Sequence, residues 1–530
     1  MQISLGKRRG FPDVGLWLTG AGGSRLLAVA LAAVAALHLL SLPRTPLPFV
    51  DDAWFACRAY AVARTGSSYS TLDAGVSDWF QGSWTCIPWL GSWLQSWSVR
   101  ALGPTLLAIR LPSFFFGLGL LAALYSIGRS VGGARVGLLA ALLAALSQPF
   151  VVSAHLGRPD VIVAAFGFAA VALYFGDRAS GLSPKSVLSG LAVGLAIEIH
   201  PNGIIYGPAI LALYLVEHGR ALLRVRRFWG FTLGLAAGLL FYVALHILPY
   251  PVTYFALNAL VYGPTHTPPV LVPGPWVWLR SLGDMLGQLL LANNWWVPLL
   301  MGALVSLVRR RSPADRRLLT LFGAVMLSYA ELVRHKHPFY AILALPAGHL
   351  LLALLLERMI QRISVAARRR GPGARLAVAL RMGGILLLLA GAFRNMYAIG
   401  ENPTPDYERT MSQVAASVPA GASVMGPQTY WFAVPDHVYL SWEQLVYYRR
   451  YRPGSDLADA FRALRPDVFI IDRAVEDFAV ADDPSELTRY GRFLHLPKAQ
   501  LDAFLAQQAE LSATVETATF GYVRVYRIRW

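Results

Sequence analysis

The chain has 530 residues, of which 55% are hydrophobic and 15% are charged, and its mean hydropathy is +0.48. Soluble domains carry about 25% charged residues, so this composition excludes a soluble globular protein and predicts a polytopic α-helical membrane protein. The net charge of +17 does not indicate nucleic-acid binding, because Lys and Arg stand in short clusters between apolar runs, as they do in cytoplasmic loops.

The apolar runs predict about eleven membrane spans, each near the ~20 residues that a bilayer requires. The segment "GKRRG" precedes the first run, and no small-residue cleavage site follows that run. The first run is therefore predicted to be a retained span and not a cleaved signal. The predicted spans cover residues 26–43, 106–127, 135–153, 160–176, 186–199, 203–217, 228–249, 287–308, 318–333, 339–356 and 376–396.

The basic clusters predict the orientation of these spans. Six of them fall on one side of the membrane if the spans alternate, and the positive-inside rule makes that side cytoplasmic. They are "GKRRG", "GRSVGGAR", "DRASGLSPK", "HGRALLRVRR", "VRRRSPADRR" and "ERMIQRISVAARRRGPGAR". The first outer loop, the short loops with "SAHLGRPD", "EIHPN" and "RHKHP", the 250–280 loop and everything after residue 400 then lie outside the cytoplasm.

The first outer loop begins with the two adjacent carboxylates of Asp51 and Asp52. Two neighbouring carboxylates are costly at a membrane boundary because they repel each other. Two interpretations are open: the pair caps the start of a helix, where Asp is favoured, or it serves chemistry at that boundary. In a helix the two side chains would point about 100° apart.

The same loop holds both cysteines of the chain, Cys57 and Cys86. Disulfides persist outside the cytoplasm, so a Cys57–Cys86 bond is predicted, with two buried free thiols as the alternative. Trp89, Trp93 and Trp97 are four residues apart and would share one face of an amphipathic juxtamembrane helix. An interfacial helix is the favoured interpretation, and stacking on a sugar or a lipid is the alternative.

Ionisable residues gather at the predicted outer ends of the spans. Such groups are candidates for function by default, and the alternative is that they pair only to tie loops together. Acids predominate in the early loops and bases in the later ones. The residues are Asp51, Asp52, Arg110, His155, Arg158, Asp160, Glu198, His200, His266, Arg334, His335, Lys336 and His337.

The composition changes after residue 400, where Asp and Glu become frequent. Apolar stretches of strand character, "ASVMG", "PDVFIIDR" and "GYVRVYRIRW", alternate with the helical patterns "GSDLADAFRAL" and "KAQLDAFLAQQAEL". We therefore expect a transmembrane domain of residues 1–399 and a small extracytoplasmic α/β domain of residues 400–530.

Five segments are informative through their order and spacing along the chain: "PFVDDAWFACRA", "AIRLPSFFFGLGLL", "SAHLGRPDVIVAAF", "EIHPNGIIYGPAIL" and "HKHPFYAILALPAG". Over about residues 25–400 the chain resembles the membrane glycosyltransferases of the GT-C superfamily. The likeness is greatest to bacterial relatives of protein O-mannosyltransferases and to the lipid A aminoarabinose transferase. The first outer loop departs from the latter, because "WTCIPWL" lacks the charged Glu-Lys-Pro-Pro stretch, which shifts the phosphate-binding role to Lys336 and Arg334.

The resemblance implies an inverting transfer of a sugar from a polyprenyl phosphate to an acceptor hydroxyl at the outer membrane face. Asp51 would be the general base. The residues fall into three implied groups. The catalytic acids are Asp51, Asp52 and Asp160; the donor-phosphate ligands are Lys336, Arg334, His335, His337 and Arg158; the other substrate contacts are His200, Asn202, Tyr340, His155 and Trp89.

The expected partners are the lipid-linked sugar donor, membrane lipids and a hydroxyl acceptor on a glycan, a lipid or a protein, with no nucleic acid. No cofactor is required, although His335 and His337 together with the acids leave a divalent metal open. The expected location is the bacterial cytoplasmic membrane, with the active site outside the cytoplasm. A transporter or glycolipid flippase is the alternative function, but the span interiors are almost purely apolar and the polar groups stand at one rim.

Overall fold

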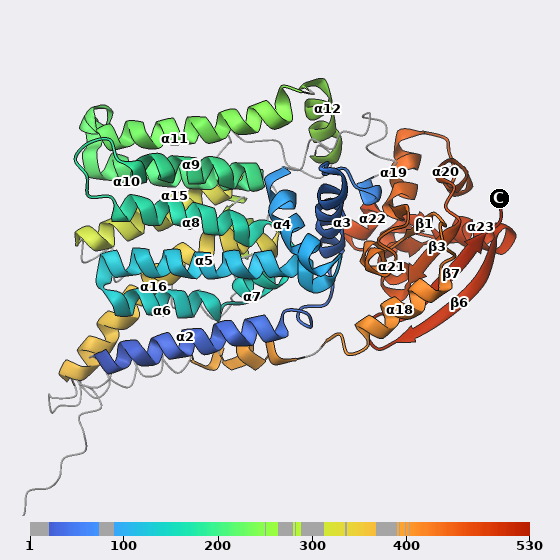
Figure 1. Cartoon of the computed structure of the whole chain (residues 1–530), viewed down its shortest axis with the longest axis horizontal. Helices are drawn as coiled ribbons and strands as arrows, with labels where there is room; N and C mark the ends of the chain where they lie inside the picture. Colours follow the sequence, from blue (N-terminus) through green and yellow to red (C-terminus); the bar gives the residue numbers. More distant parts are fainter. Residues whose placement is uncertain are drawn as a thin grey trace, which may run out of the picture.

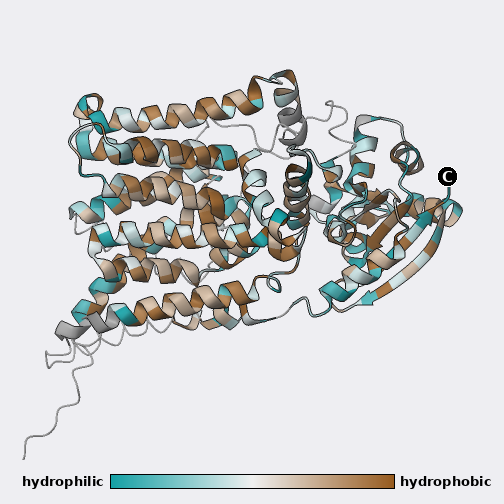
Figure 2. Ribbon diagram, viewed as in Figure 1, coloured by the Kyte–Doolittle hydropathy of each residue, from teal (hydrophilic) through white to brown (hydrophobic). Residues whose placement is uncertain are grey.

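The computed structural model shows long helices lying side by side, with a sheet-containing unit at one end of the bundle (Figure 1). It describes residues 21–73, 89–249, 251–262, 279–280, 282–287, 312–333, 337–366, 389–391, 393–397, 399–401 and 403–530. Hydrophobic residues dominate the bundle helices, and hydrophilic residues gather at their ends and over the sheet unit (Figure 2).

The bundle helices coincide with most of the predicted spans. They are α2 (Ala21–Ser41), α5 (Leu106–Gly132), α6 (Ala134–Ala145), α7 (Gln148–His155), α8 (Asp160–Gly176), α9 (Pro184–Ile199), α10 (Tyr206–His218), α11 (Arg226–Tyr242), α15 (Pro313–Leu332) and α16 (Ala341–Ala366). The predicted spans 287–308 and 376–396 lie largely outside the described residues.

Within the described part of the chain, four helices are long and apolar enough to cross a membrane. They are Ser24–Ser41, Leu106–Gly132, Arg226–Ile247 and Pro338–Arg362. The bent pair α6 and α7, which meet at 67°, makes a fifth if it is one span. The structure thus confirms a helical bundle with several apolar spans, whereas the count of eleven stays a prediction.

Ion pairs link the helix ends that lie away from the sheet unit. Arg358 pairs with the buried Asp315 at 2.6 Å, and Arg135 lies 3.3 Å from Glu357. Asp315 is also the third residue of α15, where it closes a capping box with Ser312. These are the ends that carry the clustered Lys and Arg residues of the sequence.

Helices α9 and α11 approach each other closely because glycines face each other at their contact. A Cβ atom added at Gly194 would lie 2.6 Å from the Cα atom of Gly238, and one added at Gly190 would lie 1.9 Å from the carbonyl oxygen of Phe231. Small residues let helix backbones pack directly in membranes, where van der Waals contact drives association.

Helices α3 (Val50–Thr65) and α4 (Trp89–Leu102) lie between the bundle and the sheet unit, with the short η1 (Thr71–Asp73) beside α3. On α4 the ring centroids of Trp89, Trp93 and Trp97 follow one another at 5.7 Å, so the prediction that they share one helix face is confirmed.

The predicted disulfide is not borne out at Cys57, which is a buried free thiol. Its Sγ atom lies 3.8 Å from Thr71 Oγ1 on η1, in the core between α3 and η1. The thiol is instead surrounded by Ser70, Thr71 and the backbone of Leu72, at the contact of α3 with η1. Cys86 lies outside the described residues.

The C-terminal unit is built on a five-stranded mixed sheet of order β2-β1-β3-β7-β6. Strands β1 (Val424–Gly426), β2 (Tyr439–Ser441) and β3 (Val468–Asp472) are parallel, and β7 (Gly521–Ile528) pairs antiparallel with β3 and with β6 (Ala509–Thr517). A short second sheet pairs β4 (Val480–Ala481) with β5 (Leu496–Pro497).

The helices of this unit are α18 (Tyr407–Ser417), η7 (Gln428–Ala433), α19 (Glu443–Tyr451), α20 (Leu457–Leu464), α21 (Arg473–Ala479), η8 (Pro484–Glu486), α22 (Arg489–Phe493) and α23 (Lys498–Gln508). The three strands and both helices read from the sequence are therefore present. One boundary was wrong: residues 509–511, predicted as helix, begin β6, because pairing with β7 outweighs local helix propensity.

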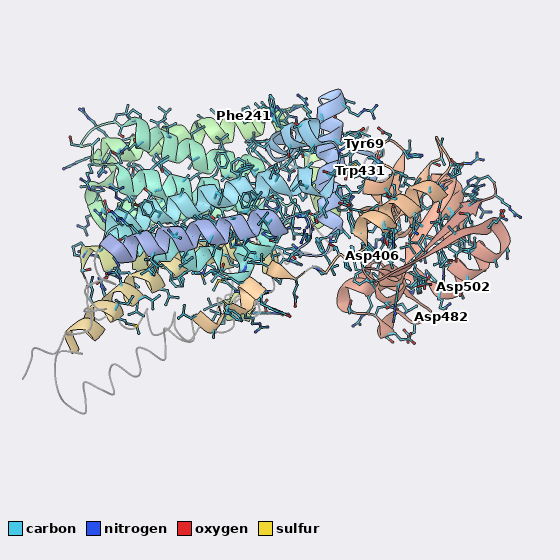
Figure 3. The ribbon with its side chains drawn as sticks, turned by 60° about the horizontal axis from the view of Figure 1, so that its bottom comes forward. Tyr69, Phe241, Asp406, Trp431, Asp482 and Asp502 are labelled. Atoms are coloured by element: carbon cyan, nitrogen blue, oxygen red, sulfur yellow. The ribbon has the colours of Figure 1, made fainter. Side chains whose placement is uncertain are left out.

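The hydrophobic core of the C-terminal unit continues into α3. One buried cluster joins Ala53, Ala56 and Ala59 of α3 to Tyr430 and Trp431 of η7. Figure 3 labels Trp431 at this junction. Helix α3 therefore contributes to the core of the C-terminal unit, while α3 and α4 also pack on the bundle.

We predict that Gly190→Ala lowers the thermal stability of the detergent-solubilised protein, because the new methyl group would meet the backbone of α11. Overpacking of this kind typically costs about 1–3 kcal/mol. The measurement is the midpoint of thermal unfolding. Gly119→Ala on α5 is the matched control, since its added Cβ has no neighbour within 4 Å. Equal unfolding midpoints for the two variants would contradict the close α9–α11 contact.

Candidate active site

Asp52 is fully buried at the start of α3, and both of its carboxylate oxygens accept hydrogen bonds. Its Oδ2 atom accepts hydrogen bonds from the backbone N–H of Phe49 at 3.0 Å and from Arg110 at 2.8 Å. Its Oδ1 atom accepts one from the backbone N–H of Gly157 at 2.6 Å. Arg110 also donates to the carbonyl of Leu42 at 3.0 Å. Asp52 therefore caps α3 and joins it to α2, α5 and the loop before α8.

Asp51, one residue earlier, points to a different part of the site. It pairs with Arg158, and the Nε atom of Arg158 donates to Asp160 at 2.7 Å. The Asp51 side chain is 17% exposed and that of Arg158 is 11% exposed, whereas Asp52 has no exposed surface. Of the two adjacent acids, Asp51 is the one that a substrate could reach.

Arg158 forms the centre of a cluster that we call the rim cluster: Asp51, Arg158, Asp160, His200 and Tyr340. The guanidinium of Arg158 lies 5.7 Å from the ring centroid of Tyr340, and the rings of His200 and Tyr340 are 5.8 Å apart. These residues come from four separate regions of the sequence, and the helix ends bring them together.

Aromatic rings pack against Arg158, the central residue of the rim cluster. Arg158 lies 4.6 Å from the ring centroid of Phe339, which contacts both Phe49 and His337, at centroid distances of 5.1 and 4.2 Å. A guanidinium above an aromatic face is stabilised by the ring quadrupole and is held in one orientation. Sequence reasoning missed Phe339, although it stands beside the predicted Tyr340.

Burial shapes the electrostatics of the rim cluster. It raises the pKa of Asp51, an effect that the nearby charges of Asp160 and Asp52 reinforce and that the positive charge of Arg158 opposes. Burial also lowers the pKa of His200 to about 4, so this imidazole is neutral at neutral pH. A carboxylate with a raised pKa is a stronger proton acceptor, which is what a general base requires.

The remaining predicted residues lie in different places. His155 is buried away from the rim cluster, with its ring nitrogens 2.8 Å from His38 and 2.7 Å from the carbonyl of Thr45. Its contacts join α7 to α2, so the structure does not bring it to the site, and its partner His38 was missed. Trp89 belongs to the tryptophan row on α4.

Asn202 follows His200 in a short 3-10 turn, where its backbone N–H donates to His200 Nδ1 at 3.2 Å. His337 begins the turn that leads into α16 and accepts from the backbone N–H of Phe339 at 3.4 Å. Arg334, His335 and Lys336 lie outside the described residues.

The described acids do not fit a divalent metal. Arg158 stands between Asp51 and Asp160 and pairs with both carboxylates, which is the position that a bridging cation would need. No group of three or more His, Cys, Asp or Glu side chains in the described ranges is arranged to hold a metal ion.

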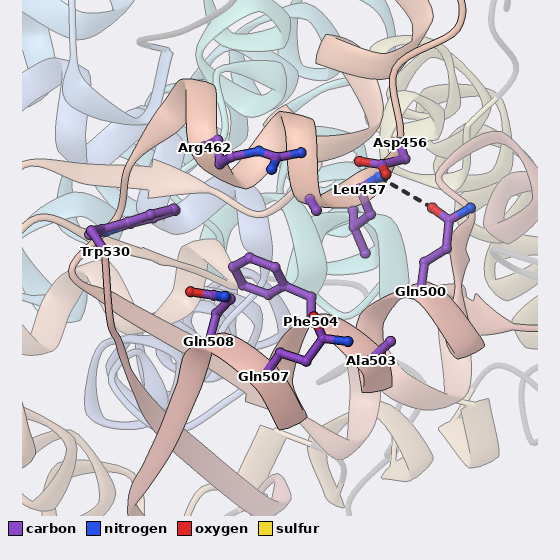
Figure 4. Close-up of a pocket in the computed structure, with 10 residues that line it drawn as sticks. Asp456, Leu457, Arg462, Gln500, Ala503, Phe504, Gln507, Gln508 and Trp530 are labelled. Atoms are coloured by element: carbon purple, nitrogen blue, oxygen red, sulfur yellow. Dashed lines mark hydrogen bonds between the residues drawn. The ribbon is translucent and has the colours of Figure 1, made fainter.

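A pocket of about 450 Å³ lies in the C-terminal unit and shares no residue with the rim cluster (Figure 4). Its walls come from α20, α23 and the end of the chain, including Phe504, Gln500 and Trp530. The ring of Phe504 stacks on Phe461 at 4.1 Å, so one wall is part of the core of this unit.

Comparison with known proteins gives one family match over part of the chain and several structures of similar fold. Residues 87–247 match the family model described as dolichyl-phosphate-mannose-protein mannosyltransferase. No curated protein matches the chain by sequence.

Solved structures share the fold at low sequence identity. ArnT from Cupriavidus metallidurans, bound to undecaprenyl phosphate, has a TM-score of 0.63 and 13% identity, covering 96% of this chain and 98% of that chain. The archaeal oligosaccharyltransferase AglB from Archaeoglobus fulgidus, with an inhibitory peptide and a dolichol-phosphate, has a TM-score of 0.55 and 13% identity, covering 86% and 70%.

The mycobacterial arabinofuranosyltransferase AftD has a TM-score of 0.50 and 14% identity, and the match covers 96% of this chain and 42% of AftD. The structural likeness is one of fold. Together with the family-model match, it confirms the resemblance to the GT-C glycosyltransferases. The chain thus has the fold of multi-pass membrane proteins of this kind, and part of its helical bundle matches a glycosyltransferase family model.

We predict that Asp52→Asn destabilises the fold, because it leaves the buried guanidinium of Arg110 without its counter-charge. Breaking a buried pair by removing one partner typically costs about 3–5 kcal/mol. Thermal unfolding in detergent is the measurement. Asp436→Asn is the matched control, because Asp436 pairs with Arg64 at an exposed site and such pairs contribute at most ~1 kcal/mol. An Asp52→Asn variant as stable as the control would show that the pair is dispensable.

Proposed function

We propose that the protein is an inverting glycosyltransferase that moves a sugar from a polyprenyl phosphate to an acceptor hydroxyl at the outer face of the bacterial cytoplasmic membrane. The observation that carries this proposal is the rim cluster, in which a partly exposed acid of raised pKa pairs with a partly exposed cation at the end of an apolar bundle. The ArnT structure of similar fold binds undecaprenyl phosphate, a lipid of this class.

The proposed reaction is a single displacement. The acceptor oxygen attacks the anomeric carbon, a new C–O bond forms on the face opposite the phosphate, and the configuration inverts. The bond between the anomeric carbon and the phosphate oxygen breaks, and its electron pair stays on the lipid phosphate. The proton of the acceptor hydroxyl passes to Asp51, whose raised pKa suits it to general base catalysis.

Arg158 is the described cation best placed for the leaving phosphate. Its charge-assisted hydrogen bonds would strengthen as negative charge grows on the departing oxygen. We propose that Lys336, Arg334, His335 and His337 assist it, since they precede in the sequence the turn that brings Phe339 and Tyr340 to Arg158. Phosphate binding would draw Arg158 away from Asp51 and leave that carboxylate free to accept a proton.

Asp160 keeps Arg158 in position through the 2.7 Å contact with its Nε atom. His200, Asn202 and Tyr340 are the proposed contacts of the transferred sugar, because the neutral imidazole of His200 and the hydroxyl of Tyr340 can donate and accept hydrogen bonds. Because the proposed mechanism needs only a hydroxyl group, the acceptor can be a glycan, a lipid or a protein.

We predict that Asp51→Asn abolishes transfer while the fold and the donor affinity are retained. The amide keeps the shape of the side chain but does not take up the proton of the acceptor at neutral pH. General base catalysis typically contributes ~10²–10⁴-fold, so the rate should fall by about that factor. The measurement is transfer from radiolabelled polyprenyl-phosphate sugars by the purified protein.

The unfolding midpoint of Asp51→Asn serves as its control, since a misfolded membrane protein would imitate a catalytic defect. Full transfer by a well-folded Asp51→Asn variant would move the base to another acid. Transport of the labelled lipid across vesicles without any transfer would favour the flippase alternative.

We also propose the topology that the charges indicate: about eleven spans, a cytoplasmic amino terminus, a catalytic domain of residues 1–399 and an extracytoplasmic domain of residues 400–530. The placement of the sheet unit against the end of the bundle that carries the rim cluster supports it. Substrate lipid would then enter from the outer leaflet.

This topology predicts that a phosphatase reporter fused after Trp530 is active in the bacterial periplasm, whereas a β-galactosidase reporter at the same point is inactive. A fusion in the basic loop after Ser312 should give the opposite pair of results. An inactive phosphatase after Trp530, together with an active β-galactosidase there, would reverse the orientation.

A further inference from the structure

The two faces of the C-terminal sheet have different neighbours. Val468 and Ile470 of β3 belong to the core that includes α3. The residue between them, Phe469, belongs to a second core together with Phe461 of α20 and Phe504 of α23. Successive side chains of a strand point to opposite faces of a sheet. Helices α20 and α23 therefore cover the face that is turned away from α3, on the side of this unit remote from the bundle (Figure 1).

The pocket of about 450 Å³ lies between these two helices. The ring of Phe504 forms its floor, because this residue is only 4% exposed and stacks on Phe461 in the core. Binding sites for small molecules typically measure about 300–1,000 Å³, so the pocket is large enough to hold one. The larger side chains that surround the Phe504 ring in Figure 4 are Asp456, Arg462, Gln500, Gln507, Gln508 and Trp530.

Trp530 contributes an aromatic ring that is both exposed and fixed in position. It is 43% exposed, yet its indole Nε1–H donates to the carbonyl of Pro466 at 3.0 Å. The guanidinium of Arg465 lies 5.8 Å from the centroid of the indole, and the ring of Phe504 lies 6.4 Å from it. Because the N–H group of the indole is already bonded, Trp530 offers a ligand its apolar ring surface.

Amide and carboxylate groups stand beside this ring. The Oε1 atom of Gln500 accepts from the backbone N–H of Leu457 at 3.2 Å, which orients the amide. The Oδ1 atom of Asp456 accepts from the backbone N–H of Asp459 at 2.7 Å, at the start of α20. These two bonds use neither the NH₂ group of Gln500 nor the Oδ2 atom of Asp456. The pocket therefore offers a ligand both donors and acceptors of hydrogen bonds.

The charges of the pocket favour an uncharged ligand. Its two charged side chains, Asp456 and Arg462, have opposite signs, and Arg462 is also paired with Asp459 at 2.7 Å. An anion would place its charge near two carboxylates, and a cation would place its charge near the guanidinium. Three of the remaining polar side chains are neutral glutamines. Hydroxyl groups suit them, because a hydroxyl both donates and accepts.

We infer that this pocket binds a neutral sugar unit of a glycan, at a site separate from the rim cluster. The apolar C–H groups on one side of a pyranose ring would lie against the indole of Trp530, whose face carries partial negative charge. The hydroxyl groups at the edge of the sugar would bond to Gln500 and Asp456. Binding at this site needs no donor lipid, so it is independent of the proposed function. It would keep a glycan on the protein while the rim cluster stays free.

The test measures binding to the full-length protein by ligand-observed NMR titration. The protein is placed in nanodiscs of zwitterionic lipid, because a detergent with a sugar headgroup would compete for the site. The probes are the neutral disaccharides cellobiose, maltose, mannobiose and galactobiose, the open-chain polyol sorbitol, and inorganic phosphate. Sorbitol carries hydroxyl groups but has no rigid apolar face, so it separates stacking from hydrogen bonding alone.

We expect at least one disaccharide to bind the wild type, and Trp530→Ala to raise its Kd by about 10-fold, as the loss of an aromatic contact predicts. Trp530→Phe should restore part of the affinity. Gln500→Ala should raise the Kd by about 2–10-fold, through the loss of a hydrogen bond between neutral groups. Sorbitol should bind more weakly than the disaccharide, and its binding should not depend on Trp530.

Trp229→Ala is the matched control. Trp229 on α11 is 51% exposed, and its indole Nε1–H donates to the carbonyl of Leu223 at 2.9 Å, so it resembles Trp530 in both respects but lies outside the pocket. This variant should bind the disaccharide as the wild type does. Asp51→Asn should also bind it normally, even where transfer is lost, which separates this site from the proposed catalytic function.

Three results would overturn the assignment of a sugar site. The first is a wild-type protein that binds none of the four disaccharides. The second is disaccharide binding that Trp530→Ala leaves unchanged, or that Trp229→Ala weakens equally. The third is binding of phosphate that depends on Trp530, which would assign the pocket to an anion. The unfolding midpoints of all variants are measured alongside, and Gln500→Ala, an exposed change, tests the site if Trp530→Ala is unstable.

Discussion

The buried pair of Asp52 and Arg110 determines the geometry of the bundle end that carries the rim cluster. Asp52 holds the first turn of α3 through the backbone of Phe49, and it holds the loop before α8 through the backbone of Gly157. Because Asp51 is the adjacent residue, its direction follows from that of Asp52. A buried ion pair is weak evidence for added stability, but it specifies one arrangement of the elements that it joins. Here that arrangement turns one acid inward and leaves the other accessible.

The charges of the rim cluster indicate what a donor phosphate would need. Two carboxylates, Asp51 and Asp160, share one guanidinium, and the imidazole of His200 is neutral at neutral pH. An arriving phosphate adds more negative charge to this set. A donor phosphate would therefore need further cations beside Arg158, and the proposed candidates are Arg334, His335 and Lys336, which precede the turn with Phe339 and Tyr340 in the sequence.

The sequence predicted the bundle and most of the rim because both follow from strong local signals. Apolar runs mark the helices, and an ionisable residue at the end of such a run, as at Asp160 or His200, has few places to lie other than the rim. The distinct roles of Asp51 and Asp52 could not be read, because both capping and catalysis favour acids at a helix start. The structural contacts of each carboxylate are needed to tell the capping acid from the partly exposed one.

Other features depend on packing between distant segments, for which the sequence carries no periodic signal. His155 looked like a rim residue, but the bend between α6 and α7 turns it toward His38. Cys57 looked like half of a disulfide, yet it faces a core that α3 shares with the C-terminal unit. Gln500 and Trp530 stand in no motif, and only the folded C-terminal unit brings them to one pocket.

The shared core determines where the C-terminal unit lies relative to α3. Independent domains usually meet at polar surfaces and move relative to each other. Here Trp431 is buried against Tyr60. The segment that precedes the C-terminal unit is also bonded to the segment between α2 and α3, because the hydroxyl of Thr45 donates to the carbonyl of Glu401 at 2.7 Å. Separation of the two units would expose this apolar cluster to water, so the position of the C-terminal unit is determined by the same hydrophobic effect that folds it.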